Sequence, residues 1–361
     1  MLTPNEVLTP LRYPPFKSGQ HQFRLLKLLP AQSDRISGTL EVFNIGAVNC
    51  PRYQALSYQW GPEVSLQKIT VNNGYLEIRP NLFDFLAQVE SDSNIEYIWI
   101  DQICIDQSSV QERNAQVPLM DQIYTFAFRV IAWLGGPSSD GSRMLEETLR
   151  FYKQKVASND LSPIDPSERS PHDPWRFIKA TYWGRGWIQQ ELLLAKNITL
   201  RCGSESMEWA DLTKILEGPK GPIEQWPYAS FSLFRLRRGN TPLQLLPLPH
   251  VLDAFSRCQW TDGRDRVFGL LALVRPGERI EVDYGLDPYE VMKAAVLKCV
   301  ELGFDYGGCI GENGSYTYTI PYNVPEPPGK LLCDLKLERP IPVAELRRAR
   351  WSGIRRRWLG I

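Results

Sequence analysis

Short apolar segments alternate with amphipathic ones over the first two thirds of the chain. Two strand-like segments, 22–29 and 36–43, contain β-branched or aromatic residues and are separated by Pro30 and polar residues. Further strand-like segments lie at 53–60, 67–71, 95–100, 130–134 and 198–202. An Asn72-Asn73-Gly74 turn follows the 67–71 segment. The apolar pattern therefore predicts a sheet that begins near the N-terminus.

Helical periodicity occupies the stretches between these segments. We expect a helix that Asn81 caps and that the polar cluster 91–94 ends. A helix over 111–128 contains Pro118, which should kink it or delay its start. Further helices are expected over 143–155, 186–195 and 209–216. Strands and helices that alternate in this way form βα units, so we predict an α/β fold with a mostly parallel sheet flanked by helices.

A Pro- and Gly-rich stretch at 218–249 has no sustained periodicity. The region after it is expected to be mainly helical, and Asp287, Pro288 and Glu290 mark a helix start as N-cap, first-turn proline and acidic third position. We therefore divide the chain into an N-terminal extension (1–21), an α/β domain (22–217), an irregular segment (218–249) and a helical C-terminal region (250–361).

The charge balance argues against a strongly charged partner. The 361 residues include 41 basic and 41 acidic ones, so no net field attracts the chain to nucleic acid or an anionic membrane. Six arginines in the last sixteen residues are interpreted as a solvated helix end, with a nucleic-acid or anionic-lipid patch as the alternative. No apolar run approaches the roughly 20 residues that span a bilayer, and the N-terminus does not resemble a secretory signal. We expect a cytoplasmic protein without a membrane span.

Metal and cofactor chemistry have little support in the sequence. The seven cysteines are widely spaced without a CxxC pair, and there are only three histidines. No Walker loop, GxGxxG fingerprint or HExxH motif occurs. We therefore expect no metal site and no bound cofactor. Cys104 is interpreted as a buried, small apolar residue, because no histidine accompanies it in a way that would make it a nucleophile.

Three segments together resemble the fungal heterokaryon incompatibility (HET) domain. They are YQALSYQWG at 53–61, WIDQICIDQ at 99–107 with its continuation to VIAWLG at 130–135, and RGWIQQELLLAKNITLRCG at 185–203. A later block, DGRDRVFGLLALV, is similar to the region that follows this domain in many members. The resemblance implies a role in non-self recognition and programmed cell death, a form of fungal innate immunity, and assigns the predicted 22–217 domain to this family.

The HET domain has been likened to Toll/interleukin receptor (TIR) domains, and two segments here carry that likeness. Residues 55–58 (ALSY) resemble the first-strand motif of a TIR domain, and residues 187–192 (WIQQEL) resemble its WCxxEL helix. The resemblance implies a TIR-like, flavodoxin-like sheet. In TIR domains that cleave NAD the glutamate of that helix is catalytic, which points to Glu191.

Cleavage of the bond between nicotinamide and ribose requires stabilisation of an oxocarbenium-like ribose. A single carboxylate in a water-poor cleft, here Glu191, can supply it. The alternative for Glu191 is a helix-surface residue or an ion-pair partner of Arg185. The proposed substrate-binding residues are Ser57, Tyr58, Trp60, Asp101, Arg185 and Trp187. Core packing is the alternative for Tyr58 and Trp60, and capping of the next segment is the alternative for Asp101.

Two functions are compatible with this pattern. The first is an NAD glycohydrolase, with NAD as substrate and no resident cofactor, whose activity kills the cell. The second is a signalling module that acts by oligomerisation without turnover, as many TIR adaptors do. In both cases the expected partners are a second copy of the chain or an allelic or non-allelic incompatibility protein.

Overall fold

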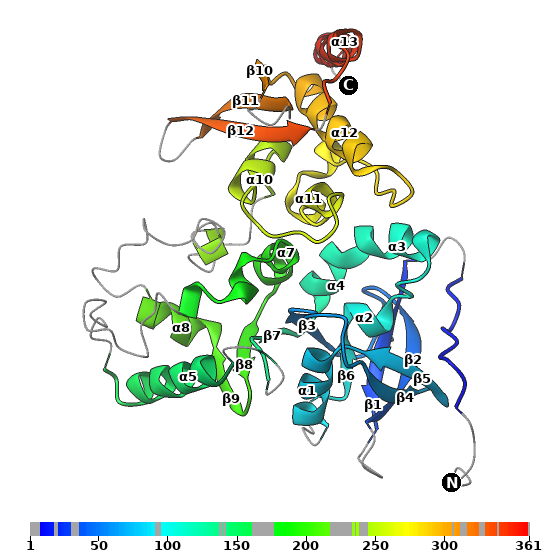
Figure 1. Ribbon diagram of the computed structural model, residues 1–361, viewed down its shortest axis with the longest axis vertical. Helices are drawn as coiled ribbons and strands as arrows, with labels where there is room; N and C mark the ends of the chain where they lie inside the picture. The colour runs from blue at the N-terminus through cyan, green and yellow to red at the C-terminus, as the bar shows by residue number, and fades with distance from the viewer. Residues whose placement is uncertain are drawn as a thin grey trace. The chain divides into compact units, whose positions relative to one another are not determined.

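A computed structural model describes most of the chain (Figure 1). The described residues are 8–17, 21–29, 36–90, 95–136, 139, 142–160, 177–216, 233–234, 236–237, 245–304, 307–310, 316–324, 329–337 and 339–359. They form two compact units. The N-terminal unit comprises Met1–Trp183 and Leu194–Trp226, and the C-terminal unit comprises Gly184–Leu193 and Pro227–Ile361. Most of the predicted irregular segment 218–249 lies outside the described residues.

The N-terminal unit is built on a nine-stranded sheet in the order β5-β4-β2-β1-β6-β3-β7-β8-β9. Its strands are β1 (Gln22–Leu28), β2 (Ser37–Asn44), β3 (Gln54–Tyr58), β4 (Gln67–Val71), β5 (Gly74–Ile78), β6 (Tyr97–Trp99), β7 (Arg129–Trp133), β8 (Ile198–Cys202) and β9 (Glu205–Glu208). The α/β class that the sequence predicts is confirmed.

The sheet is mixed, so the prediction of a mostly parallel sheet is wrong. Strands β6, β3, β7 and β8 run parallel to one another, and β2 pairs with β4 in parallel. The pairs β1–β2, β4–β5 and β8–β9 are antiparallel hairpins, and β1 also pairs antiparallel with β6. Short connections cannot make the crossover that a parallel pair needs, so these hairpins turn the outer strands antiparallel.

Strand β5 was not predicted, and the geometry of the β4–β5 hairpin explains why. Asn72 and Asn73 have φ values of 49° and 64°, the left-handed conformation of a tight hairpin turn. Strand β5 leaves this turn and pairs along the whole of β4. The N-terminal segment then lies along β5, where Leu11 N donates to Tyr75 O at 2.8 Å and Tyr75 N donates to Thr9 O at 2.9 Å.

The helices of the N-terminal unit follow the predicted order. They are α1 (Pro80–Val89), α2 (Asp101–Cys104), α3 (Val110–Gln116), α4 (Met120–Phe126), α5 (Ser142–Ala157) and α8 (Trp209–Leu216). A 3-10 turn at Val117–Leu119 separates α3 from α4, so Pro118 interrupts the predicted 111–128 helix as expected.

The predicted cap of α1 is wrong. Arg79 is the N-cap residue, and Asn81 lies inside the first turn. The Asn81 side chain instead accepts a hydrogen bond from Trp133 Nε1 at 2.8 Å and donates one to Gln59 O. The helix ends at Val89, and the polar cluster 91–94 lies outside the described residues.

Large aromatic residues fill the core between the sheet and its helices. Trp99 and Trp133 are fully buried on β6 and β7. The Trp99 ring lies 5.3 Å from that of Tyr124 on α4, and the Trp133 ring lies 5.5 Å from that of Phe85 on α1. These edge-on contacts fix the helices over the carboxyl-terminal halves of the parallel strands.

The C-terminal unit contains helices and a separate sheet. The helices are α7 (Trp187–Leu194, up to Leu193 in this unit), α10 (Leu248–Ala254), α11 (Asp265–Phe268), α12 (Pro288–Glu301) and α13 (Val343–Leu359). Strands β10 (Gly307–Ile310), β11 (Tyr316–Val324) and β12 (Gly329–Leu337) form an antiparallel sheet, and β12 contacts α10 and α12 (Figure 1). The prediction of a mainly helical region therefore fails over 307–337.

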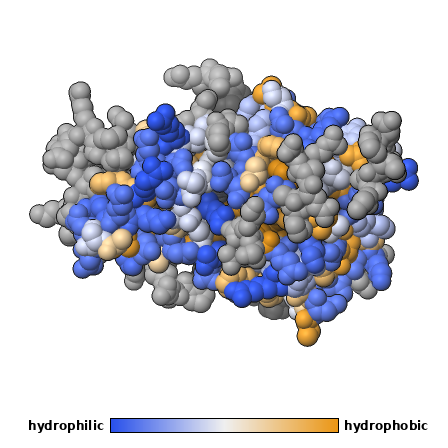
Figure 2. All heavy atoms as spheres, turned by 90° about the horizontal axis from the view of Figure 1, so that it is seen from below, coloured by the Kyte–Doolittle hydropathy of each residue, from blue (hydrophilic) through white to orange (hydrophobic). Residues whose placement is uncertain are grey.

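The surface carries few large apolar side chains. Val48 and Phe126 are among the exposed ones. On the face drawn in Figure 2, hydrophilic residues cover more of the coloured surface than hydrophobic ones. No helix within the described part of the chain is long and apolar enough to cross a membrane.

The N-cap of α12 gives a direct test of the C-terminal unit. Asp287 accepts a hydrogen bond from Tyr289 N at 2.8 Å, as the sequence predicts. We expect Asp287→Ala to lower the stability of this unit by about 0.5–2 kcal/mol, because the first helical turn loses its acceptor. Hydrogen exchange of the α12 amides measures this. Glu281→Ala removes an exposed carboxylate nearby and should leave the exchange unchanged; equal effects would contradict the capping role.

Candidate functional site

The segment after β6 brings two of the predicted site residues together. Asp101 is the first residue of α2, and its Oδ2 accepts a hydrogen bond from Trp60 Nε1 at 2.7 Å. Its Oδ1 accepts from the backbone N–H of Gln102 at 2.7 Å, so Asp101 also satisfies the start of the helix. Asp101 and Trp60 therefore form an acid and aromatic pair at the carboxyl ends of β6 and β3, where ligand groups lie in α/β sheets.

The rest of this segment is held by its own polar side chains. Asp106 Oδ1 accepts hydrogen bonds from the backbone N–H and the hydroxyl of Ser108, at 3.0 and 2.6 Å. Gln107 Nε2 donates to Asp101 O at 2.8 Å. Ser109 caps α3 by accepting from Glu112 N. Most polar residues of the WIDQICIDQ motif therefore shape the loop and do not face outward as reactive groups.

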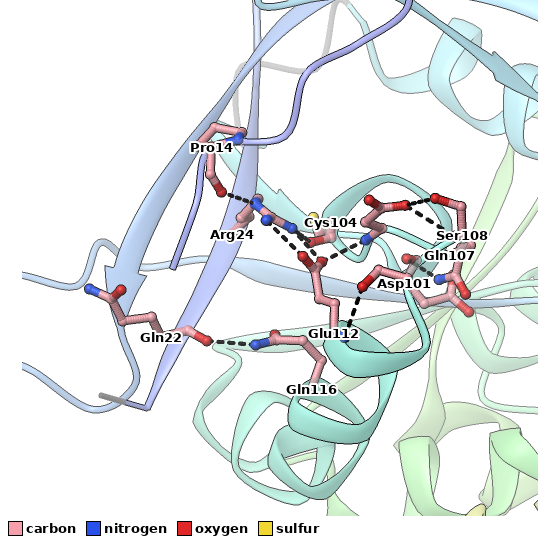
Figure 3. Close-up of polar contacts among 11 residues, drawn as sticks. Pro14, Gln22, Arg24, Asp101, Cys104, Gln107, Ser108, Glu112 and Gln116 are labelled. Carbon is pink, nitrogen blue, oxygen red and sulfur yellow. Dashed lines mark hydrogen bonds and ion pairs between the residues drawn. The ribbon is translucent and has the colours of Figure 1, made fainter. Parts of the chain in front are cut away.

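A buried ion pair lies beneath this loop (Figure 3). Arg24 on β1 is 1% exposed, and its guanidinium binds both carboxylate oxygens of Glu112, at 2.6 and 3.0 Å. Arg24 also donates to Cys104 O at 3.1 Å and to Pro14 O at 2.8 Å. Glu112 in turn accepts from Asp106 N at 2.6 Å. This ion pair thus ties β1, α3, the motif loop and the N-terminal segment together.

The motif cysteine is part of the core. Cys104 is fully buried, and burial raises the pKa of its thiol to about 12. Its sulfur accepts a hydrogen bond from Ile100 N at 3.4 Å. At neutral pH the thiol is protonated, so it does not act as a nucleophile. This agrees with the interpretation of Cys104 as a small apolar core residue.

Ser57 and Tyr58 on β3 are buried, and each makes a side-chain hydrogen bond. Ser57 is fully buried, and its hydroxyl lies 2.8 Å from that of Tyr182. Tyr58 is 3% exposed and donates to Gln102 Oε1 at 3.1 Å. Both side chains support the strand end that precedes Trp60. Their assignment to substrate binding stays a prediction.

The other predicted site residues, Arg185, Trp187 and Glu191, belong to the C-terminal unit. Three consecutive polar side chains on α7 are buried: Gln189 (0% exposed), Gln190 (1%) and Glu191 (5%). Gln190 Nε2 has no hydrogen-bond partner among the described residues. Because burying polar groups costs free energy, helices rarely carry such a run without a specific purpose.

Trp187 fixes the first turn of α7. Its Nε1 donates to Asp265 Oδ2 at 3.0 Å, and Tyr284 Oη donates to Asp265 Oδ1 at 2.7 Å. Burial raises the pKa of Asp265 to about 6, against the lowering effect of these two hydrogen bonds. At neutral pH Asp265 is therefore mostly ionised and accepts both hydrogen bonds.

The residues just before α7, 184–186, are positioned by contacts with residues 259–260. Gly186 N donates to Gln259 O at 3.1 Å, and Gln259 N donates to Gly184 O at 2.7 Å. A Cβ at Gly186 would lie 2.0 Å from the ring of Trp260, so only glycine fits. The RGW segment at 185–187 and the later WTDGRDRVFG segment at 260–269 therefore pack against each other.

The sequence analysis did not identify the residues that stabilise the WIDQICIDQ loop and the start of α7. The partners Arg24 and Glu112 are 88 positions apart, and Trp187 and Asp265 are 78 apart. The later block was noticed only through its resemblance, and Asp265 lies within it. No cluster of three or more metal-ligating side chains occurs in the part of the chain that the structure describes.

Comparison with known proteins identifies the class of this domain. Residues 53–191 match the family model "Heterokaryon incompatibility protein (HET)". This interval includes the Trp60–Asp101 pair, the motif loop and α7 up to Glu191. This part of the chain is therefore similar to the fungal HET domain. No solved structure matches it significantly.

Two curated relatives share this similarity. The chain is 25% identical to "Heterokaryon incompatibility protein 6, OR allele" of Neurospora crassa, over 64% of this chain and 44% of the relative. It is 25% identical to "Vegetative incompatibility protein HET-E-1" of Podospora anserina, over 41% of this chain and 9% of the relative. The chain thus spans less than half the length of either relative.

We expect loss of the buried ion pair to destabilise the N-terminal unit strongly. Arg24→Met leaves the Glu112 carboxylate without its charge partner and should cost about 3–5 kcal/mol, measured by urea unfolding. The double variant Arg24→Met/Glu112→Met removes both charges and should recover part of this loss. Lys27→Met, which breaks an exposed ion pair with Glu96, should leave the midpoint unchanged. Equal midpoints for Arg24→Met and Lys27→Met would contradict this role.

Asp265 should make the stability of the C-terminal unit depend on pH. Its folded pKa of about 6 lies above the ordinary value of 3.8, so the folded state binds the proton more tightly. The stability that Asp265 contributes therefore falls as pH rises from about 4 through 6, by no more than about 3 kcal/mol in total, and levels off above about pH 7.

Comparison with Asp265→Asn isolates this effect. We expect the unfolding free energy of the wild-type protein minus that of the variant to decrease from pH 4 to 6. The lost hydrogen bond adds an offset that does not change with pH. A difference that is constant or increases over this range would show that Asp265 does not titrate as described.

Proposed function

We propose that this chain acts in heterokaryon incompatibility, as an effector of non-self recognition that leads to cell death. The HET family match over 53–191 and the names of the two curated relatives support this role. We further propose that the HET domain acts as an NAD glycohydrolase with Glu191 as its catalytic carboxylate. The observation that carries this finer proposal is the burial of Glu191 beside two buried glutamines on α7.

The proposed reaction is hydrolysis of the bond between nicotinamide and ribose. Nicotinamide leaves with the bonding electron pair as a neutral molecule, and water adds to the ribose carbon and releases a proton. The products are nicotinamide and ADP-ribose. Because the departing base needs no proton, the main requirement is an anion beside the positive charge that develops on the ribose. A carboxylate held at 5% exposure on a fixed helix meets this requirement.

The position of Glu191 on α7 is well defined. Trp187 is anchored to Asp265 at the start of the helix, and Arg237 donates to Leu192 O at its end. A cation at a helix C-terminus is stabilised by the helix dipole. The helix is therefore fixed at both ends around the proposed catalytic carboxylate.

The other predicted residues are assigned roles by their chemistry. In the N-terminal unit, the proposed roles are an aromatic face for a base (Trp60) and a carboxylate for ribose hydroxyls (Asp101). In the C-terminal unit, they are a guanidinium for a pyrophosphate (Arg185) and orientation of the helix (Trp187). Ser57 and Tyr58, which are buried, would act by supporting the strand end.

Nicotinamide release from NAD by the purified chain tests the enzymatic proposal. We expect Glu191→Gln to lower this rate about 100-fold or more, because the amide keeps the shape of the side chain but loses its charge. Glu147→Gln removes an exposed carboxylate of α5 and should retain the wild-type rate. The assay is run at several protein concentrations, since turnover that requires self-association appears only at high concentration.

The same variants in fungal cells separate enzyme from signalling module. If the proposal is correct, Glu191→Gln abolishes both nicotinamide release and cell death. Cell death that persists in Glu191→Gln, without NAD cleavage by either protein, would instead indicate a module that acts by oligomerisation. A folded Glu191→Gln variant with wild-type turnover would remove Glu191 from the mechanism.

A further inference from the structure

A second polar site lies in the N-terminal unit, at the other end of its parallel strands. A cavity of about 480 Å³ opens there, within the size range of small-molecule sites. Its lining includes Arg52, Gln54, Glu96, Tyr97, Phe128 and Arg129. Glu96 is the one carboxylate among the lining residues, and its charge is paired with Lys27 at 3.2 Å. Gln54, Tyr97 and Arg129 are the first residues of β3, β6 and β7, whereas Trp60 and Asp101 follow the ends of β3 and β6. The cavity is therefore distinct from the Trp60–Asp101 pair.

Arg52 presents an unpaired charge at this cavity. The residue is exposed, and its guanidinium carbon lies 3.2 Å from the centre of the Phe128 ring. Within the described residues it makes no hydrogen bond or ion pair. The ring attracts the guanidinium through a cation–π contact, which uses none of its N–H groups, so these can still donate to an acceptor beside the ring.

Arg129 is only partly satisfied. Its Nη1 donates to Thr199 Oγ1 at 2.7 Å and to Glu208 Oε1 at 2.9 Å. Its Nη2 and Nε have no partner among the described residues, and Nε is buried. An unsatisfied buried donor costs free energy that an entering acceptor would recover after a small rotation of the side chain.

The two arginines share one aromatic ring. The Arg129 guanidinium carbon lies 5.7 Å from the centre of the same Phe128 ring. Glu208 is the one carboxylate in ion-pair contact with either guanidinium within the described structure. Two like charges beside one ring repel each other, and a bound anion would convert that repulsion into attraction.

We propose that this cavity binds a small phosphate ester. The phosphate lies between Arg52 and Arg129, and the organic part contacts the part of the Phe128 ring that Arg52 leaves uncovered; Phe128 is 37% exposed. A phosphate monoester carries nearly two negative charges and three acceptor oxygens, which match two guanidinium groups better than a carboxylate does. This site does not depend on the proposed chemistry of Glu191.

Calorimetric titration of the whole chain tests this site, with AMP, phenyl phosphate, adenosine and inorganic phosphate as probes. We expect at least one of the two esters to bind at least 10-fold more tightly than inorganic phosphate, and adenosine not to bind. Arg52→Ala should weaken binding of the ester about 10-fold or more. Arg129→Lys keeps a positive charge for Glu208 but loses the Nη2 and Nε donors of the guanidinium. It should weaken binding of the ester by a similar factor.

Matched controls exclude general effects of charge and folding. Arg143→Ala removes an arginine whose side chain is 92% exposed on α5, and should leave the affinity unchanged. Melting curves of each variant confirm that it is folded. Glu191→Gln should also bind the ester with wild-type affinity, which distinguishes this site from the proposed NAD site.

Several results would overturn the proposal. One is the absence of binding of both esters at millimolar concentration. Another is inorganic phosphate or adenosine that binds as tightly as the esters. A third is ester binding that survives both Arg52→Ala and Arg129→Lys, or that is lost in Glu191→Gln alone, because the ester would then occupy a different site.

Discussion

The N-terminal unit depends on one buried ion pair. The guanidinium of Arg24, which is 1% exposed, binds both carboxylate oxygens of Glu112, which is 14% exposed, so the buried arginine charge depends on this carboxylate. A hydrophobic pair could fill the same volume at similar stability, but it could not also accept from Asp106 N and donate to Cys104 O and Pro14 O. The ion pair therefore specifies the conformation of the loop rather than simply adding stability.

This constraint explains why the most polar motif of the domain is largely structural. Asp106, Gln107 and Glu112 all direct their side chains to backbone groups or to Arg24, which leaves Asp101 with Trp60 as the part of the motif nearest to a site. From the amino-acid sequence alone, a motif rich in carboxylates is easily interpreted as catalytic. Here the hydrogen bonds show a structural role for each acid of the motif, whereas Glu191, for which we propose catalysis, is a buried acid on α7.

Sequence reasoning performed well where the information is local. The Asp287 cap, the break at Pro118 and the two strands predicted at 22–29 and 36–43 each depend on neighbouring residues, and each is confirmed. Strand β5 was missed because its five residues follow a two-residue turn, and the mixed sheet was missed because pairing direction is a property of distant strands. The same limit applies to the site: Trp187 and Glu191 were identified from a local pattern, whereas Asp265 is brought to Trp187 only by the fold.

The two ends of the parallel strands differ in charge, and this difference follows from how the sheet is covered. At the carboxyl ends, α2 and the chain after β3 supply Asp101 and Trp60. At the amino ends, the chain enters β3 and β7 directly from Arg52 and Phe128, so arginines and an exposed ring reach the edge of the sheet without a helix to cover them. Within the described residues Arg129 pairs with Glu208 and Glu96 pairs with Lys27, whereas Arg52 makes no ion pair. The proposed anion site at the amino-terminal end therefore depends on the charge of Arg52 and on the remaining N–H groups of Arg129.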